Sequence, residues 1–392
     1  MKEILRKFRR ELHQIPEPAF EEKNTAKYIR QKLSEHNIPY EEIKTEYYDT
    51  GTLVYFKGEK GCIAFRSDID GLPIVEENKC EFISRNKNCH ACGHDGHAAT
   101  LLTFAIWLKN LQESGKKFKK SIVLIFQPGE EGKGGARYLS KHPSYLNKHI
   151  EAIFGMHLSP LFPQGTIASK PGPVMAQTIN LDIKVTGHGT HGAQPQNGID
   201  TILATSRLID AYQSVVSRNI SPFENVVVTI GSIHGGVTRN IIPETVSLLG
   251  TVRLFNKDII PKIEKRMSDI NRGFEISYGV KIDFGFTPVY SPVVNDPVLF
   301  EKFKLAVDPD KLIICTPQMI AEDFSFYLQD TPGVFFFLGV RNEEKGFIQP
   351  LHNPKFNFDE DALLLGLQTF ENICNIMAVS YTHLTLPTTE RV

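Results

Sequence analysis

Two consecutive stretches, TINLDIKVTG (residues 178–187) and DTILATSRLIDAYQSVVSRN (residues 200–219), decide the fold that we expect. The first alternates apolar and polar residues with the period of a half-buried strand, and the second has the spacing of a long amphipathic helix. Two further strand-like segments, a second long helical segment and a last strand follow, up to about residue 288. This β-α-β-β-α-β order is typical of a small ferredoxin-like domain.

The sequence on either side of this segment has a different style. Short runs rich in Val, Ile and Phe, such as SIVLIF (residues 121–126) and VFFFLGV (residues 334–340), alternate with longer amphipathic stretches. This alternation predicts an α/β fold in which helices flank a mainly parallel or mixed sheet. We therefore expect one domain built from residues 1–176 and 291–378, with residues 177–290 inserted into it. Residues 379–392 become Thr-rich without helical period, and we expect a non-native or disordered tail there.

Composition excludes several classes of function. The 392 residues include 44 basic and 45 acidic side chains, giving a net charge of −1, so neither nucleic acid nor an anionic membrane is an expected partner. The amino terminus is charged throughout, unlike a signal peptide, and no apolar run reaches the roughly 18 residues of a membrane span. Six cysteines in a chain of this length do not form a disulfide framework. We expect a cytoplasmic protein with reduced thiols.

The densest chemistry lies in CHACGHDGH (residues 89–97). Cys89 and Cys92 form a C-x-x-C pair, which is compatible with a redox dithiol or a structural zinc site. A zinc ribbon needs a second such pair, which the chain lacks, and a dithiol leaves three histidines unexplained. Cys92 and His94 are two residues apart and are predicted to serve one metal centre from a loop before a helix that begins near Ala98.

More potential ligands follow the ends of predicted strands, which is where α/β sheets place their sites. They are Glu130 and Glu131 in QPGEEG, His157 in GMHLSP, Asp68 and Asp70 in RSDIDG, and His352 in a distant loop. Thiolate, imidazole and carboxylate suit zinc, and the nitrogen and oxygen donors also accept manganese, cobalt or nickel. Two such ions can activate a water molecule and polarise a carbonyl, while a free carboxylate moves the proton. This set predicts amide hydrolysis without a covalent intermediate.

Nine motifs in this order make the chain resemble a known family. They are RSDIDGLPI, HACGHDGH, QPGEEG, GMHLSP, GHGTHGAQP, RNIIPE, GTVR, AEDFSF and LHNP. The chain is similar to the binuclear-metal aminoacylase and carboxypeptidase family of metallopeptidases, in its amidohydrolase branch. The resemblance implies a catalytic domain at 1–176 and 291–378 and a lid or dimerisation domain at 177–290, which suggests a homodimer.

The resemblance also implies roles for individual residues. Two divalent ions (Zn, Mn, Co or Ni) would be bound by Cys92, His94, Glu131, His157 and His352. Glu130 would be the general base and acid. Asp68, Asp70 and Asp95 would orient the ligands or the site loop, although Asp side chains also cap loops for purely structural reasons.

Other implied roles concern the substrate. His191 matches a histidine that stabilises the oxyanion, often from the partner subunit, while Asn240 and Arg253 match positions that bind the substrate carboxylate. Glu322 is a weaker candidate. The chain departs from the family pattern at Cys89, where Met is usual, which argues against Cys89 as a ligand. It also departs at Thr190 and Gln196, which puts the lid geometry and the substrate preference in question.

The leading hypothesis is metal-dependent hydrolysis of N-acyl amino acids, small molecules from which a water bound to metal removes the acyl group with Glu130 as base. An N-acetyldiaminopimelate deacetylase of lysine biosynthesis is the alternative, because SVVSRNISP, VTIGSIHGG and EDFSFYLQDTPGVFFFLGV resemble those enzymes. A carboxypeptidase or dipeptidase is a third reading. A non-catalytic scaffold on the same fold would be expected to lose Glu130, which is present.

Overall fold

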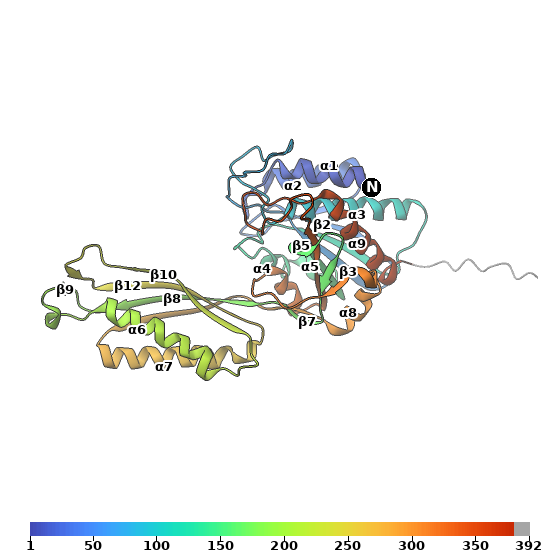
Figure 1. Cartoon of the computed structure of the whole chain (residues 1–392). Coiled ribbons are helices and arrows are strands. Elements are labelled where there is room, and N and C mark those ends of the chain that lie inside the picture. The colour runs from blue at the N-terminus through green and yellow to red at the C-terminus, as the bar shows by residue number, and fades with distance from the viewer. Residues whose placement is uncertain (380–392) are drawn as a thin grey trace, which may run out of the picture. The chain divides into compact units, whose positions relative to one another are not determined.

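The computed structural model describes residues 1–379, and the chain divides into two compact units (Figure 1). Unit 1 contains Met1–Gly172, Asn295–Cys315 and the chain from Phe326 onward, and unit 2 contains Pro173–Val294 and Thr316–Ser325. Of the predicted tail, 379–392, only Val379 is described, where it pairs with Phe118. The rest of that tail lies outside the described residues.

An eight-stranded mixed sheet forms the centre of unit 1, with the strand order β1-β2-β4-β3-β5-β16-β6-β15. Strands β3, β4 and β5 are parallel neighbours, and β16 runs parallel to β5 on its other side. The predicted α/β fold with a mixed sheet is therefore confirmed. The strands are β1 (Tyr40–Ile43), β2 (Gly51–Phe56), β3 (Cys62–Asp68), β4 (Ser121–Gln127), β5 (Ala152–Pro163), β6 (Ile167–Ser169), β15 (Leu312–Ile314) and β16 (Gly333–Arg341).

The core of unit 1 is aromatic and lies where α3 (His94–Glu113) packs on the sheet. Phe65 of β3 stacks on Phe154 of β5 at a centroid distance of 5.6 Å and meets Phe104 of α3 edge-on at 4.9 Å. Such pairs add to the stabilisation that burial of the rings already provides. The other helices of this unit are α1 (Lys2–His13), α2 (Lys23–Glu35), α4 (Ala136–Leu139), α5 (Pro143–Leu146), α8 (Pro297–Lys304) and α9 (Leu363–Met377).

Unit 2 has the β-α-β-β-α-β order that the opening stretches predict. Its four-stranded sheet is antiparallel throughout, with the order β10-β12-β8-β13. The elements are β8 (Gln177–Thr186), α6 (Thr201–Ser214), β10 (Val226–Gly235), β12 (Thr245–Leu254), α7 (Ile260–Tyr278) and β13 (Lys281–Tyr290). Alternate residues of β8 are buried with residues of α6 and α7 in one core, which explains the alternation in the sequence.

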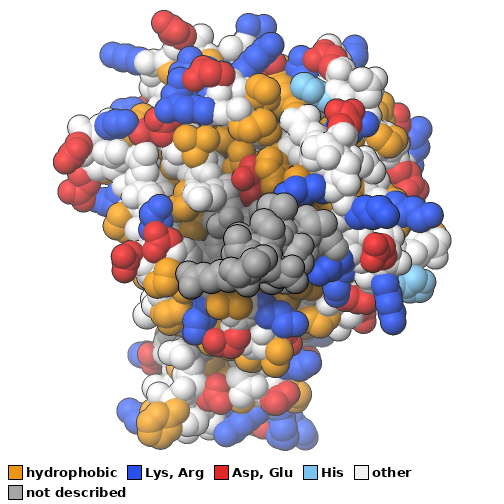
Figure 2. All heavy atoms as spheres, turned by 90° about the vertical axis from the view of Figure 1, so that its right-hand side faces the viewer, with side chains coloured by type: hydrophobic (Ala, Val, Ile, Leu, Met, Phe, Trp, Pro, Cys, Tyr) orange, Lys and Arg blue, Asp and Glu red, His pale blue; other side chains and the backbone are white. Residues whose placement is uncertain are grey.

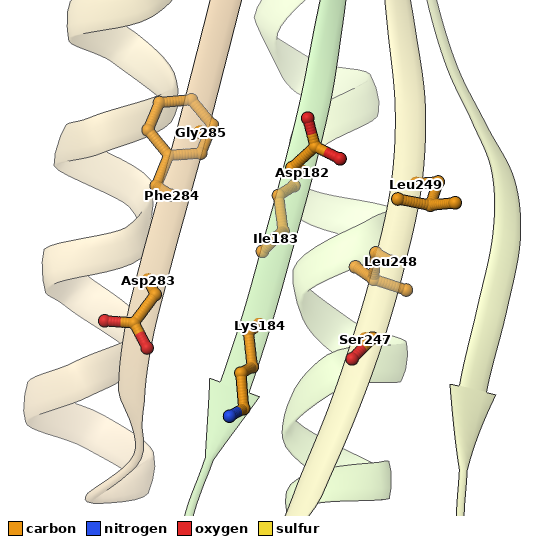
Figure 3. A pocket seen from close by; sticks show the side chains of 9 residues that line it. All are labelled: Asp182, Ile183, Lys184, Ser247, Leu248, Leu249, Asp283, Phe284 and Gly285. Atoms are coloured by element: carbon orange, nitrogen blue, oxygen red, sulfur yellow. The ribbon is translucent and has the colours of Figure 1, made fainter.

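A shallow hollow of about 440 Å³ lies on the sheet of unit 2 (Figure 3). It is lined by residues of β8, β12 and β13, and helices α6 and α7 lie behind the sheet in this view. Asp182, Lys184 and Leu249 line it from the exposed positions of their strands. The hollow contains none of the predicted site residues, so we do not assign substrate binding to it.

The surface matches the balanced composition. On the face that Figure 2 shows, Lys and Arg side chains lie interspersed with Asp and Glu side chains. Within residues 1–379, none of the helices combines the length and apolar character needed to cross a membrane.

Candidate metal centre and active site

Three parallel strands in unit 1 bring the first site residues together near the carboxyl ends of β3 and β4. Asp68, the last residue of β3, lies opposite Gln127, the last residue of β4. On the other side of β3, Arg66 lies opposite Gly155 of β5, which places His157 of β5 two residues further along the same edge. The ends of β3 and β4 thus lie at one edge of the sheet, as the motif positions predict. The expectation that His157 lies at the end of its strand is wrong, because β5 continues to Pro163.

Cys92 and His94 reach this edge through a sharp turn. Gly93 has a φ of +85°, a left-handed conformation that a side chain disfavours. Helix α3 then begins at His94, so the expectation that His94 lies in a loop before a helix at Ala98 is wrong. The turn at Gly93 allows the helix to begin one turn earlier, with His94 as its first residue.

The five predicted metal ligands are gathered in one place. One ligand atom each of Cys92, His94 and Glu131 lie within 4.8 Å of one another. The Sγ of Cys92 lies 3.5 Å from Nε2 of His157, and Nε2 of His352 lies 3.1 Å from Oε1 of Glu131. The loop that carries His352 is fixed locally, because its backbone N–H donates to the carbonyl of Ala91.

Hydrogen bonds distinguish His94 and His157, each with one ring nitrogen directed at a protein oxygen, from His97, whose two ring nitrogens both have partners. His94 points Nδ1 at the carboxylate and carbonyl oxygens of Asp70, and among the described residues its buried Nε2 has no hydrogen-bond partner. His157 points Nδ1 at the carbonyl of Leu158, which leaves Nε2 facing Cys92. His97 has both nitrogens engaged, one with Asp68 and one accepting from the backbone N–H of Leu158.

His97 nevertheless belongs to the site's framework, a role that sequence reasoning missed. Asp68 bridges His97 at 2.6 Å and Arg66 at 2.8 Å, and Arg66 also donates to Gln127 at 2.8 Å. These side chains are buried, so each bond fixes the strand edge more firmly than an exposed pair would. The available signal was an arginine within an otherwise apolar strand, because a buried arginine requires partners.

Asp70 links the first residue of helix α3, His94, to the loop after β4 that carries Glu131. Its Oδ1 lies 3.1 Å from Nδ1 of His94, and its Oδ2 accepts from the backbone N–H of Glu131 at 2.9 Å. A carboxylate behind a ligating histidine fixes the ring's orientation and tautomer. The position of Asp70 is thus the one expected of a ligand-orienting residue.

Asp95 lies in a different environment. Its carboxylate is 3.0 Å from Nε of Arg9 and 2.7 Å from Nδ1 of His13, both on α1. All three side chains are buried. The partners of Asp95 therefore tie the start of α3 to α1, and its effect on His94 is exerted through the backbone of the helix.

The electrostatics of the ligand group favour a bound cation. Burial opposes protonation of His94, but the carboxylates of Asp68 and Asp70 outweigh burial and raise its pKa to about 10. Burial raises the pKa of the Cys92 thiol well above its usual range, and Glu131 and Glu130 raise it further. Burial lowers the pKa of His157 and keeps this ring neutral. A divalent ion would supply the positive charge that this carboxylate-rich pocket stabilises and would convert the thiol to a thiolate.

These residues therefore fit a divalent metal. The donor set is one thiol, three imidazoles and one carboxylate, and the buried Nε2 of His94 has no hydrogen-bond partner among the described residues. The set suits zinc and tolerates neighbouring transition metals. Burial opposes ionisation of Glu131, but His352 and His94 outweigh burial and lower its pKa. The ionised carboxylate that results can donate electron pairs to a metal.

Glu130 adjoins this group without belonging to it. Its side chain is buried, being 7% exposed, and it follows the left-handed Gly129 in the loop after β4. Glu130 is not one of the clustered donors Cys92, His94 and Glu131. Cys89 has a different environment: its side chain is fully buried, its backbone pairs with Leu72, and burial raises its thiol pKa to about 12.

The predicted substrate residues lie in unit 2, at two separate places. The short strands β9 (Thr190–His191) and β11 (Ile241–Ile242) pair, and the backbone N–H of Gly192 donates to the carbonyl of Asn240. His191 and Asn240 are thus neighbours, and both are exposed. Glu322 is buried in the same unit and accepts from the backbone N–H of Phe324.

Arg253 lies at the other end of the four-stranded sheet. It is paired in register with Thr178 at the start of β8, and its guanidinium donates to that threonine's hydroxyl. His191 follows the opposite end of β8, where Thr186 pairs with Thr245. At about 3.3 Å per residue, these ends are about 26 Å apart. Within one chain, unit 2 does not bring Arg253 together with His191 and Asn240.

Comparison with known proteins agrees with this geometry. Residues 64–375 match the model of Peptidase family M20/M25/M40. The chain is 40% identical over 359 residues to the N-acetyldiaminopimelate deacetylase of Exiguobacterium sibiricum, covering 91% of this chain and 94% of that protein. It is 35% identical over 361 residues to the protein of the same name from Listeria monocytogenes, with coverage of 91% and 94%.

Solved structures support the same assignment. A putative aminohydrolase from methicillin-resistant Staphylococcus aureus superposes with a TM-score of 0.86 at 33% identity, covering 96% of both chains. The YXEP protein of Bacillus subtilis, described as a dinuclear metal binding peptidase of family M20, gives a TM-score of 0.81 at 31% identity, covering 96% of this chain and 98% of that one. The predicted class of metal-dependent amide hydrolase is thereby confirmed. The chain belongs to Peptidase family M20/M25/M40.

Proposed function

We propose that the protein is an N-acetyldiaminopimelate deacetylase, which hydrolyses the acetyl amide of its substrate to acetate and a free amine. The observation that carries this proposal is the assembled group of Cys92, His94, Glu131, His157 and His352 in a chain whose similarity to two such deacetylases extends over more than 90% of each protein. The general N-acyl amino acid hydrolase, our leading hypothesis from sequence, has less support than this alternative.

Those five residues would hold two divalent ions, as proposed from the donor set. When bound, the ions would polarise the amide carbonyl and lower the pKa of the attacking water. Which of zinc, manganese, cobalt or nickel is native is set by ligand type and availability, and the single thiolate favours zinc.

The proton transfers would belong to Glu130. Its carboxylate would take a proton from the attacking water and deliver it to the leaving nitrogen, so that the amine departs neutral. The side chain of Glu130 is buried, which shields these proton transfers from bulk water.

The substrate's carboxylate and its developing oxyanion need donors from unit 2. Arg253 would bind the carboxylate through its planar guanidinium, and His191 would stabilise the developing oxyanion. Asn240, which the family resemblance assigns to the carboxylate together with Arg253, lies beside His191 instead. Because about 26 Å separates these two places within one chain, one acyl amino acid cannot contact both. We infer that each active site takes Arg253 from one chain and His191 with Asn240 from a partner, which requires a homodimer.

Mixing two inactive variants, Glu130→Gln and His191→Ala, is expected to restore activity in the heterodimer. One of its two sites would then have an intact Glu130 and an intact His191, giving about half of the wild-type turnover per heterodimer. The measurement is deacetylation by heterodimers purified with two different affinity tags. Homodimers of each variant are the controls, and an inactive, verified heterodimer would show that both residues act within one chain.

A substrate panel tests the proposed function. Turnover of N-acetyldiaminopimelate, benzoylglycine, N-acetylmethionine and a free dipeptide should be compared at equal metal loading. N-acetyldiaminopimelate is expected to lead in kcat/KM by at least about tenfold, the discrimination that a few buried polar contacts supply. A lead for benzoylglycine or N-acetylmethionine favours the general hydrolase, and a lead for the dipeptide favours a peptidase.

A further inference from the structure

We propose that Glu22, at the start of α2, is a positioning residue that holds the backbone of the loop carrying Glu130. This inference rests on the proposed role of Glu130 as the base and goes beyond it by naming what fixes its place. Glu22 lies more than a hundred residues before Glu130 in the chain, and none of the sequence motifs includes it.

Glu22 is fully buried and accepts three hydrogen bonds. Its Oε1 accepts from the backbone N–H of Gly129 at 2.8 Å and from that of Phe20 at 2.9 Å, and its Oε2 accepts from the hydroxyl of Thr50 at 2.9 Å. The bond to Gly129 joins two segments that are distant in sequence. Strand β4 ends at Gln127, so the buried N–H of Gly129 has no partner in the sheet, and Glu22 accepts its hydrogen bond.

The two neighbours of Glu130 are held by two different carboxylates. Glu22 binds the N–H of Gly129, which precedes it, and Asp70 binds the N–H of Glu131, which follows it. Fixing the backbone on both sides of a residue restricts the positions that its side chain can reach. Removing either carboxylate is therefore expected to displace Glu130 relative to the metal ligands.

The contact between α2's leading segment and the loop is also close sterically. Gly129 has a φ of +70°, and a Cβ there would lie 2.1 Å from Cε1 of Phe20. The ring of Phe20 packs against Tyr48, whose hydroxyl donates to the carbonyl of Gly135 at the far end of the same loop. The loop from Gly129 to Gly135 thus packs closely against Phe20 and Tyr48, and the carboxylate of Glu22 adds a hydrogen bond to this contact.

The chemistry needed at position 22 is that of an acceptor oxygen rather than a charge. Burial and the nearby Asp70 raise the pKa of Glu22 to about 8. The three groups that donate to Glu22 are two backbone N–H groups and a hydroxyl, all neutral. A glutamine would keep an oxygen for the backbone donors and turn its amide toward Thr50, which can accept, whereas alanine would leave both N–H groups unsatisfied.

The test compares Glu22→Ala and Glu22→Gln with the wild type at saturating metal. Glu22→Ala is expected to lower kcat by about 10²-fold with KM little changed, because misplacing a catalytic group acts on the chemical step. Glu22→Gln should stay within about fivefold of the wild type. Hydrogen exchange of the peptide spanning 127–135 should be faster in Glu22→Ala than in the wild type.

Glu17 offers a matched control in the same segment. Its carboxylate also accepts from a backbone N–H, that of Thr25 in α2, at 2.9 Å, but it does not bind the loop. Glu17→Ala should therefore lower the melting temperature comparably while leaving kcat and exchange of 127–135 unchanged. If Glu22→Ala does not fold, Glu22→Asp, whose carboxylate is one methylene shorter, replaces it with the same expectation for kcat.

Two outcomes would overturn the inference: kcat in the alanine or aspartate variant equal to that of Glu17→Ala, or a glutamine variant as slow as the alanine variant. Failure of the proposed function looks different. In that case the wild type itself would not hydrolyse N-acetyldiaminopimelate, while exchange of the 127–135 peptide would still report whether Glu22 holds the loop.

Discussion

Replacing Glu130 by glutamine is expected to lower kcat by at least about 10²–10⁴-fold while the protein keeps its metal. Glutamine has nearly the same shape but cannot carry a proton between water and the leaving amine. Because Glu130 is buried beside the ligand group and is not among its clustered donors Cys92, His94 and Glu131, metal binding should survive the change. Steady-state turnover and metal content of the same dialysed sample are the measurements.

The neighbouring carboxylate provides the control. Glu131 lies 3.1 Å from His352 and within the group of Cys92 and His94, so Glu131→Gln should lose metal as well as activity. A Glu130→Gln variant with turnover near that of the wild type would refute the assignment of the base. A Glu130→Gln variant that loses metal as Glu131→Gln does would instead make Glu130 a ligand.

Replacing Cys92 by alanine is expected to remove about one metal equivalent per chain, since a thiolate is a principal zinc ligand. Cys92 lies 3.5 Å from His157 and clusters with His94 and Glu131. Cys89, three residues earlier, is fully buried and its backbone pairs with Leu72. Cys89→Ala should therefore keep its metal and lose only the stability of a small core cavity, about 1–2 kcal/mol in free energy of unfolding.

Metal analysis after dialysis against a weak chelator decides between these cysteines. Equal metal loss in both variants would restore the reading of the C-x-x-C as a paired metal or redox motif. All six cysteines are free thiols in the structure.

Local periodicity accounts for the parts of the fold that the sequence predicted well. The alternation in residues 178–187 became β8, and the helical spacing that follows became α6, because each pattern has only one way to bury its apolar face. Asp68, at the end of β3, and His157, within β5, lie near one another because these two strands are parallel neighbours in the sheet. The proposed ligands Cys92, His94, Glu131, His157 and His352 each lie in a short motif, which is why they could be named as candidates from the sequence.

Contacts between distant segments could not be predicted in this way. Glu22 meets Gly129, and Asp95 meets Arg9 and His13, through side chains that no local pattern relates. The separation of Arg253 from Asn240 likewise depends on the register of β8 and β12, which hydrophobic alternation alone does not reveal. These contacts arise from packing, and they decide how the loop and the substrate donors are placed.

The most direct test of the proposed function is acetate release from N-acetyldiaminopimelate by protein stripped of metal and then titrated with Zn²⁺, Mn²⁺, Co²⁺ or Ni²⁺. If the protein is a two-metal deacetylase, the stripped protein should show no turnover, and turnover should rise with added metal until about two equivalents per chain are bound. The kcat/KM for N-acetyldiaminopimelate should also be at least about tenfold above that for benzoylglycine under the same loading. Turnover by the metal-free protein, or none at any loading with any of the four ions, would contradict the proposed function.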